Sequence, residues 1–205
     1  MTAFTEIQNF GWNLITASFL ATLAFTVAQG YALYQQNRKI LQHRSGKSTS
    51  FVFFSYYAFS ALAVSIYGWY KHSLALSING LLGFIALAII INLLRFKNIS
   101  GLERLLGLGA AIVIPLIIVV PQKDTLFLVF GIIVILTISA QILEIWKNKS
   151  SGSVHPGQAV VSIFSSLFWL SYALIVNIWP LKIINSIGLT LWLILLGSYF
   201  KFRDK

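Results

Sequence analysis

Residues 169–188, WLSYALIVNIWPLKIINSIG, decide the fold because they form a long apolar run that leaves little room for water. Inside this run stands an asparagine, Asn185, sixteen positions after Trp169. A carboxamide buried without a hydrogen-bond partner costs roughly 1–3 kcal/mol. We therefore expect another polar feature of the chain to account for Asn185.

The composition of the whole chain excludes a water-soluble domain. Of its 205 residues, 58% are hydrophobic and only 10% are charged, with a mean hydropathy of +0.82. Apolar runs of roughly twenty residues, the length that crosses a bilayer, recur along the chain. The sequence therefore predicts an all-α membrane protein that lies in a lipid bilayer. It contains no cysteine, which excludes disulfides and thiol chemistry.

Breaks rich in turn-forming and charged residues divide the chain into seven predicted transmembrane helices. Each is long enough, at about 1.5 Å per residue, to cross a hydrocarbon core of roughly 30 Å. The predicted spans are residues 12–36, 50–70, 73–94, 102–121, 125–146, 157–178 and 181–200.

The net charge of +10 is explained by topology, without an anionic partner such as a nucleic acid. Basic residues concentrate on the cytoplasmic side of membrane proteins. With the N-terminus outside, twelve of the fifteen basic residues fall on the cytoplasmic side, and Lys71, Lys123 and Lys182 fall outside. We therefore expect the N-terminus outside and the C-terminus in the cytoplasm, by default at a plasma membrane.

The sequence also repeats itself at an offset of 105 residues. The stretch FSAL at 59–62 aligns with FSSL at 164–167, and Tyr67 aligns with Tyr172. Self-similarity at a fixed offset indicates that one structural unit occurs twice.

The same repeat gives Asn185 a counterpart. One further residue of slip in the hairpin that follows pairs it with Asn79. The repeat predicts a three-helix unit at 1–97, a linker helix at 98–122 and a second three-helix unit at 123–205. An odd linker helix lets both units point the same way, and parallel repeats are a transporter layout with the substrate at their interface.

Two stretches resemble the PQ-loop signature, a proline–glutamine pair followed by basic residues and Lys-Ser. They are QQNRKILQHRSGKSTSF at 35–51 and AQILEIWKNKSSGSVHPG at 140–157. With the 3+1+3 arrangement and the paired asparagines, nearly the whole chain resembles the SWEET sugar transporters in their two-repeat, seven-helix form.

This resemblance implies facilitated, bidirectional uniport of a mono- or disaccharide by alternating access. It implies that Asn79 and Asn185 face each other and bind sugar hydroxyls, and that Trp169 stacks on the sugar ring. An amide supplies donors and acceptors without a charge, which suits a neutral substrate. Val64 aligns with Trp169 and belongs to the same predicted site, and Tyr57 either lines the cavity or only packs there. No cofactor or metal is expected, and the protein is either a monomer or a homo-oligomer.

The chain departs from the family where the PQ proline would stand, at Gln35 in the first repeat and Ala140 in the second. A proline frees a carbonyl and weakens a helix locally, so its loss stiffens these spans. The candidate hinge and gate positions are Gln35, Gln36, Ala140, Gln141 and Pro156, with Gly30 and Gly157 as alternative hinges.

Other interpretations stay open. The asparagines can be polar contacts between helices rather than a binding site. A proton-coupled PQ-loop transporter of amino acids, or of another small neutral solute, needs a carboxylate inside the membrane, whereas all five acids are predicted at or near its surfaces. A receptor of the same fold for an acidic peptide needs basic residues within the spans. An enzyme is the least favoured class, because no catalytic constellation appears within them.

Overall fold

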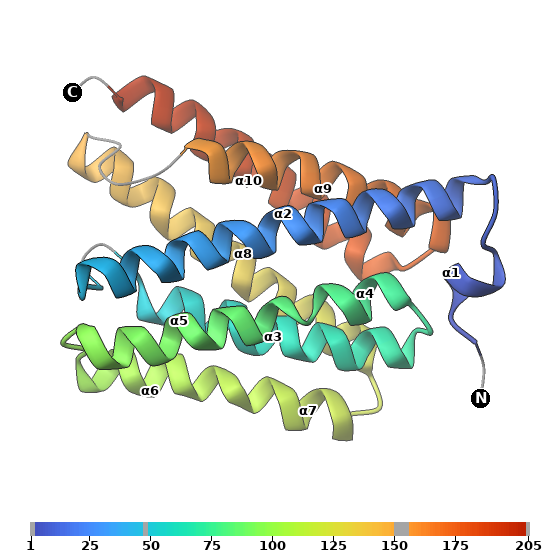
Figure 1. Cartoon of the computed structure of the whole chain (residues 1–205), viewed down its shortest axis with the longest axis horizontal. Helices are drawn as coiled ribbons and strands as arrows, with labels where there is room; N and C mark the ends of the chain where they lie inside the picture. Colours follow the sequence, from blue (N-terminus) through green and yellow to red (C-terminus); the bar gives the residue numbers. More distant parts are fainter. Residues whose placement is uncertain (1–2, 47–48, 150–155, 204–205) are drawn as a thin grey trace.

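The computed structural model describes residues 3–46, 49–149 and 156–203, without the side chains of Thr137, Ala140, Gln141, Glu144, Lys147, Asn148, Pro156 and Gln158. The described part of the chain is helical. Its elements are α1 (Thr5–Gln8), α2 (Leu14–His43), α3 (Phe51–Tyr70), α4 (Leu74–Asn79), α5 (Leu82–Phe96), α6 (Gly101–Gly109), the short 3-10 turn η1 (Ala110–Ile112), α7 (Val113–Val119), α8 (Lys123–Asn148), α9 (Pro156–Val176) and α10 (Trp179–Phe202). The long helices run side by side, with the two termini at opposite ends of the bundle (Figure 1).

Six helical stretches in the described residues are long and apolar enough to cross a membrane. They are Leu14–His43, Phe51–Tyr70, Leu74–Phe96, Gly101–Val119, Ala159–Val176 and Trp179–Phe202. The remaining predicted span, 125–146, coincides with the 26-residue helix α8, which is not among these six. An all-helical membrane protein is thereby confirmed.

The helices begin where the sequence supplies capping side chains. Ser50, Ser73 and Ser100 precede α3, α4 and α6, and each accepts a hydrogen bond from the backbone N–H three residues later. Asn13 does the same at the start of α2. Each cap satisfies a donor that the first turn of a helix leaves without a partner.

The predicted end of the first span, residue 36, is wrong: α2 continues to His43. No glycine or proline interrupts residues 31–43, so nothing in the backbone stops the helix there. It ends at Arg44, which has a left-handed backbone with φ of 45°. The predicted hinge residues Gln35 and Gln36 therefore lie within a continuous helix.

The backbone repeats with the same offset as the sequence. Four non-glycine residues of the described chain have positive φ, and they form two pairs 105 positions apart. Arg44 and Lys149 end the first helix of each set, and His72 and Asn177 form the turn before the third helix. Because the offset is still 105 at this turn, the extra residue that separates Asn79 from Asn185 enters after it, within the third helices.

Those third helices differ. In α10 the helix runs unbroken through Asn185, whereas its counterpart breaks into α4 and α5 directly after Asn79. The break is at Gly80, where an added Cβ would lie 2.4 Å from the backbone nitrogen of Ser65 on α3. Only glycine permits this approach of the two helices.

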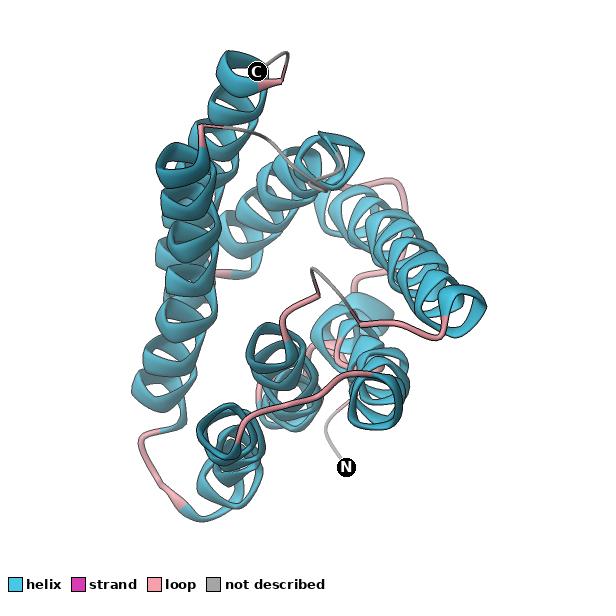
Figure 2. Ribbon diagram, turned by 90° about the vertical axis from the view of Figure 1, so that its left-hand side faces the viewer, coloured by secondary structure: helices cyan, strands magenta, loops and turns pink. Residues whose placement is uncertain are grey.

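The helices pack as two sets of three. In the first set α5 contacts both α2 and α3, and in the second set α10 contacts both α8 and α9. Across the sets, α2 packs against α9 and α3 against α8, while α6 and α7 pack against α3 and α7 also contacts α8. Seen from the end that carries the C-terminus, the helices are tilted by different amounts relative to the line of view (Figure 2).

The buried apolar side chains of the described residues form three clusters, which differ between the two ends of the bundle. The shared core joins both sets near the end that carries the N-terminus, and contains Phe19, Ala63, Tyr67, Ala75, Leu76, Val113, Ile117, Phe127, Trp169, Tyr172, Ala173, Ile178 and Leu181. Toward the other end each set has its own core, one around Phe51 and Ile89 and one around Ile138 and Leu195. The sets are therefore packed together at the N-terminal end and separate toward the C-terminal end.

Candidate functional site

A cavity of about 320 Å³ lies between the two three-helix sets. Side chains from α2, α3, α4, α7, α8, α9 and α10 line it. Among the described residues of its lining none carries a charge; the polar ones are amides, hydroxyls and the indoles of Trp169 and Trp192. A cavity of this size and chemistry suits a small neutral molecule, because ligand pockets have volumes of roughly 300–1,000 Å³.

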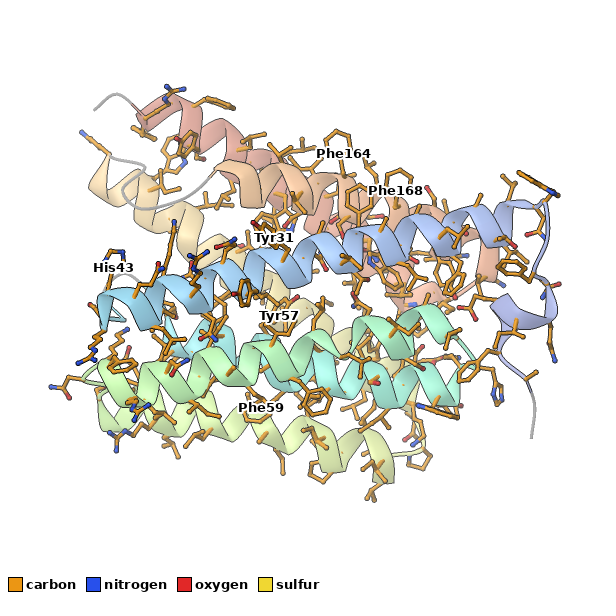
Figure 3. All side chains as sticks on the ribbon, viewed as in Figure 1. Tyr31, His43, Tyr57, Phe59, Phe164 and Phe168 are labelled. Atoms are coloured by element: carbon orange, nitrogen blue, oxygen red, sulfur yellow. The ribbon has the colours of Figure 1, made fainter. Side chains whose placement is uncertain are left out.

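All five residues predicted for substrate binding line this cavity. Asn79, Tyr57 and Val64 reach it from the first set, and Trp169 and Asn185 reach it from the second. In Figure 3 Tyr57 lies below α2 within the bundle, whereas Phe164 and Phe168 of α9 lie toward its upper edge and are exposed.

The first asparagine is held by a neighbouring helix. The hydroxyl of Thr26 on α2 donates to Asn79 Oδ1 at 3.0 Å and is shared with the Thr22 carbonyl at 2.9 Å. Among the described residues Asn79 Nδ2 has no hydrogen-bond partner. The Nδ2 group of Asn79 is therefore available to donate to a molecule in the cavity.

The second asparagine is held by its own helix. Asn185 Nδ2 donates to the backbone carbonyl of Leu181, one turn earlier, at 2.8 Å. Within the described part of the chain its Oδ1 has no partner, so this amide keeps its acceptor. The two asparagines thus offer a donor and an acceptor to the same cavity.

Trp169 is only 6% exposed and belongs to the shared core as well as to the cavity wall. Its ring meets that of Tyr172 edge to face, with centroids 5.6 Å apart. The indole therefore connects the cavity with the region where the two sets are packed together.

A polar contact that was not predicted from the sequence crosses the cavity. Gln29 on α2 donates from Nε2 to the Ser165 hydroxyl on α9 at 2.8 Å, and both residues line the cavity. Ser165 lies in the repeated FSSL stretch, aligned with Ser60, which also lines the cavity. That alignment is the signal that could have marked Ser165, whereas Gln29 is marked only by its polarity within an apolar run.

The predicted hinge residues are placed only in part. Gln36 lines the cavity and donates to the Thr49 hydroxyl at 3.2 Å, so it connects α2 to the segment before α3. Gln35 donates to the hydroxyl of Tyr31 at 2.6 Å and is not part of the lining. The side chains of Ala140, Gln141 and Pro156 lie outside the described residues.

The N-terminal end of the cavity is closed by contacts between the sets. The rings of Tyr67 on α3 and Phe127 on α8 stack with centroids 4.2 Å apart. Tyr67 also donates its hydroxyl to Asp124 at 2.8 Å, and Lys71 forms an ion pair with the same carboxylate at 2.8 Å. Asp124 lies one residue before the predicted span 125–146. Burial raises its pKa, but hydrogen bonds from Lys71 and Tyr67 outweigh this and hold the pKa below its usual range.

Comparison with known proteins agrees with this geometry. The family described as sugar efflux transporter for intercellular exchange matches residues 124–205, which is almost the whole second repeat. The solved structure of a eukaryotic SWEET transporter is similar over 94% of this chain and 98% of that chain, with a TM-score of 0.70. The family match over the second part of the chain and the SWEET-like fold of the whole chain agree with each other. No curated protein matches it.

The SWEET-like fold is shared at a sequence identity of only 17%, so this likeness shows the fold alone. The family match, in turn, covers residues 124–205, the part of the chain that carries Trp169 and Asn185. A match to a family of sugar efflux transporters agrees with the long apolar helices of an integral membrane protein.

Proposed function

We propose that the protein transports a mono- or disaccharide through the central cavity by alternating access. The observation that carries this proposal is the pair of amides: Asn79 keeps an unused donor and Asn185 an unused acceptor on one uncharged cavity. Sugar hydroxyls both donate and accept, so they match such a pair. The indole of Trp169 beside them supplies an apolar surface for the sugar ring.

The proposed architecture is the 3+1+3 arrangement, with repeats at 1–97 and 123–205 and a linker helix at 98–122. The paired left-handed residues and the matching helix contacts support it. We propose α8 as the seventh span and the N-terminus as the outer end, from the distribution of basic residues. The contacts at the N-terminal end then make this an inward-facing state, in which the sugar reaches the cavity from the cytoplasm.

We further propose that movement occurs around Gln35, Gln36, Ala140, Gln141 and Pro156. Gln36 supports this assignment, because its side chain lies on the cavity wall and contacts Thr49 before α3. Without a proline, motion here would come from changes in side-chain contacts rather than from a weakened helix.

An amino-acid carrier fits the cavity less well. A zwitterion carries two charges, and the described lining offers no charged side chain to pair with them. Proton coupling needs a carboxylate that both sides can reach in turn. Glu6 is a fully buried carboxylate, but it lies at the closed end and not on the cavity. We therefore propose uniport.

The test is counterflow of labelled glucose and sucrose into proteoliposomes, with and without an imposed pH gradient. A labelled neutral amino acid serves as the competing substrate, and the double variant Asn79→Ala/Asn185→Ala serves as the control. We expect sugar exchange that the gradient leaves unchanged and that the control lacks. Accumulation of either substrate above equilibrium under the gradient would contradict uniport, and exchange of the amino acid alone would contradict sugar transport.

A further inference from the structure

The short N-terminal helix α1 carries a buried acid that the sequence placed at the membrane surface. Glu6 is 0% exposed. Its segment is docked by two neighbouring contacts: the Thr5 N–H donates to the His72 carbonyl at 2.8 Å, and the rings of Phe4 and Trp69 meet edge to face at 5.0 Å. The segment before α2 is therefore part of the packed bundle.

The Glu6 carboxylate is surrounded by donors from both repeats. On the first repeat it accepts from the Ser73 hydroxyl at 3.0 Å and from the backbone N–H groups of Leu74 and Ala75 at 2.9 and 3.1 Å. On the second repeat it accepts from the hydroxyl of Tyr172 on α9. A buried carboxylate is costly unless hydrogen-bond donors surround it. The four hydrogen bonds therefore stabilise Glu6 in its buried position.

This arrangement has a counterpart in the first repeat. Tyr172 and Tyr67 are equivalent in the repeat and both fully buried, and each donates to an acid at the start of the other set. The two differ in environment: the Asp124 side chain that Tyr67 contacts is 29% exposed, whereas Glu6 is buried completely. Charge-assisted hydrogen bonds are stronger where water is excluded.

We propose that Glu6 is a gating residue and that residues 4–13 form a clasp over the closed end of the cavity. This inference rests on the proposed alternating access. Glu6 is bound to α4 by three contacts and to α9 by one, so separation of the repeats leaves the clasp on α4 and breaks its bond to Tyr172. The Ser73 hydroxyl, 2.7 Å from that of Tyr172, separates from it in the same movement. The bond to Tyr172 therefore opposes opening of the N-terminal end.

The clasp also lies close to the proposed substrate site. Tyr172 contacts both Glu6 and the ring of Trp169, which lines the cavity. Release of Tyr172 therefore frees the neighbour of a substrate-contacting side chain. This gives opening at the clasp a direct physical connection to the bound solute.

The experiment measures access to the cavity from the N-terminal end. The protein has no cysteine, so Ser60→Cys introduces a single reporter on the cavity wall. A membrane-impermeant thiol reagent is added to proteoliposomes on the side where an N-terminal tag is exposed. The reaction rate is compared in the reporter protein, in Glu6→Ala and in Tyr172→Phe, which keeps the ring. We expect both changes to raise the rate roughly tenfold or more, the scale for one hydrogen bond to a charged group.

Glu103→Ala is the matched control, because Glu103 caps α6 through Ser100 and makes no contact with α9. It should leave the rate unchanged. The double variant Glu6→Ala/Tyr172→Phe should react no faster than the faster single variant, since both changes break the same bond.

Unchanged access in Glu6→Ala and Tyr172→Phe would overturn the clasp, even if their melting temperatures fall. If Glu6→Ala does not fold, Tyr172→Phe decides alone. The assay needs no sugar, so it separates this inference from the proposed function. Normal sugar exchange with unchanged access would contradict the clasp but not the proposed function. Increased access without any sugar exchange would support the clasp and contradict the proposed substrate.

Discussion

Asn79 and Asn185 occupy equivalent places in the repeat, yet different parts of the molecule hold them. Asn79 depends on a hydroxyl from another helix, Thr26 on α2, and its own helix breaks at the next residue. Asn185 is bonded to its own helix at Leu181, and that helix continues. The orientation of Asn79 therefore follows α2, whereas that of Asn185 follows α10 alone.

The reason for the difference lies one helix away. At an offset of 105, the position of Thr26 is taken in the second repeat by Gly131. A Cβ at Gly131 would lie 2.3 Å from Ile184 Cδ1, so the side chain next to Asn185 fills the space that a threonine would need. The polar contact between Thr26 and Asn79 in the first repeat is thus replaced in the second by apolar packing of Ile184 against Gly131. Two copies of a sequence motif can therefore occupy equivalent positions in the fold and still differ in the contacts that hold their side chains.

Of the substitutions that compare the two repeats, the replacement of Trp169 should give the largest effect. Trp169 and Val64 are aligned in the repeat, but Trp169 is buried in the shared core, whereas Val64 is only partly buried and packs against it. We expect Trp169→Ala to lower the free energy of unfolding by about 3–5 kcal/mol and to weaken sugar binding. Val64→Ala, which removes less apolar surface, should cost less than about 2 kcal/mol.

Thermal unfolding of the purified protein with and without sugar measures both quantities. Trp169→Phe keeps a ring in the core and should recover most of the stability but not the affinity. Equal losses in Trp169→Ala and Val64→Ala would show that the two sides of the cavity are energetically alike.

The asparagines themselves should give the next effect. If they bind hydroxyls, Asn79→Ala and Asn185→Ala should each cost about 1–3 kcal/mol of sugar binding, because one polar group of the bound sugar loses its partner. That corresponds to roughly a ten- to hundredfold loss of apparent affinity in counterflow. Melting temperatures without sugar should stay near that of the unchanged protein. A fall in melting temperature with intact affinity would instead identify the asparagines as contacts between helices.

Much of this fold follows from the sequence, because each signal is local. Apolar runs locate the helices, Ser and Asn caps locate several helix starts, and the offset of 105 reappears in the backbone at Arg44 and Lys149. The predicted end of the first span, residue 36, falls short of the end of α2, because the polar and basic residues that follow it do not interrupt the helix. In an amphipathic stretch with neither glycine nor proline, polarity alone does not end a helix.

The residues of the candidate site and of its closed end likewise differ in how well the sequence predicts them. Asn79, Asn185 and Trp169 are recognisable because a polar or large aromatic side chain stands out in an apolar run. Glu6 does not stand out, because an acid near a chain terminus is ordinarily solvated. Its burial depends on donors 67 or more residues away, a tertiary arrangement that no sequence spacing encodes.

The smallest expected effect isolates the asymmetry between the asparagines. Thr26→Val keeps the shape of the side chain and removes the hydroxyl that contacts Asn79. We expect a loss of sugar affinity of about 0.5–1.5 kcal/mol, or roughly two- to twelvefold, because Asn79 is then free to turn its donor away from the cavity. Thr26→Ser should recover the affinity.

Thr22→Val is the matched control, because Thr22 lies one turn earlier on the same helix and donates only to the backbone carbonyl of Phe19. It should leave affinity unchanged. In an Asn79→Ala background, Thr26→Val should have no further effect if Thr26 acts by positioning the amide. A further loss in that background would mean that Thr26 acts on the sugar directly. Equal affinity of Thr26→Val and the unchanged protein would mean that Asn79 needs no support from α2.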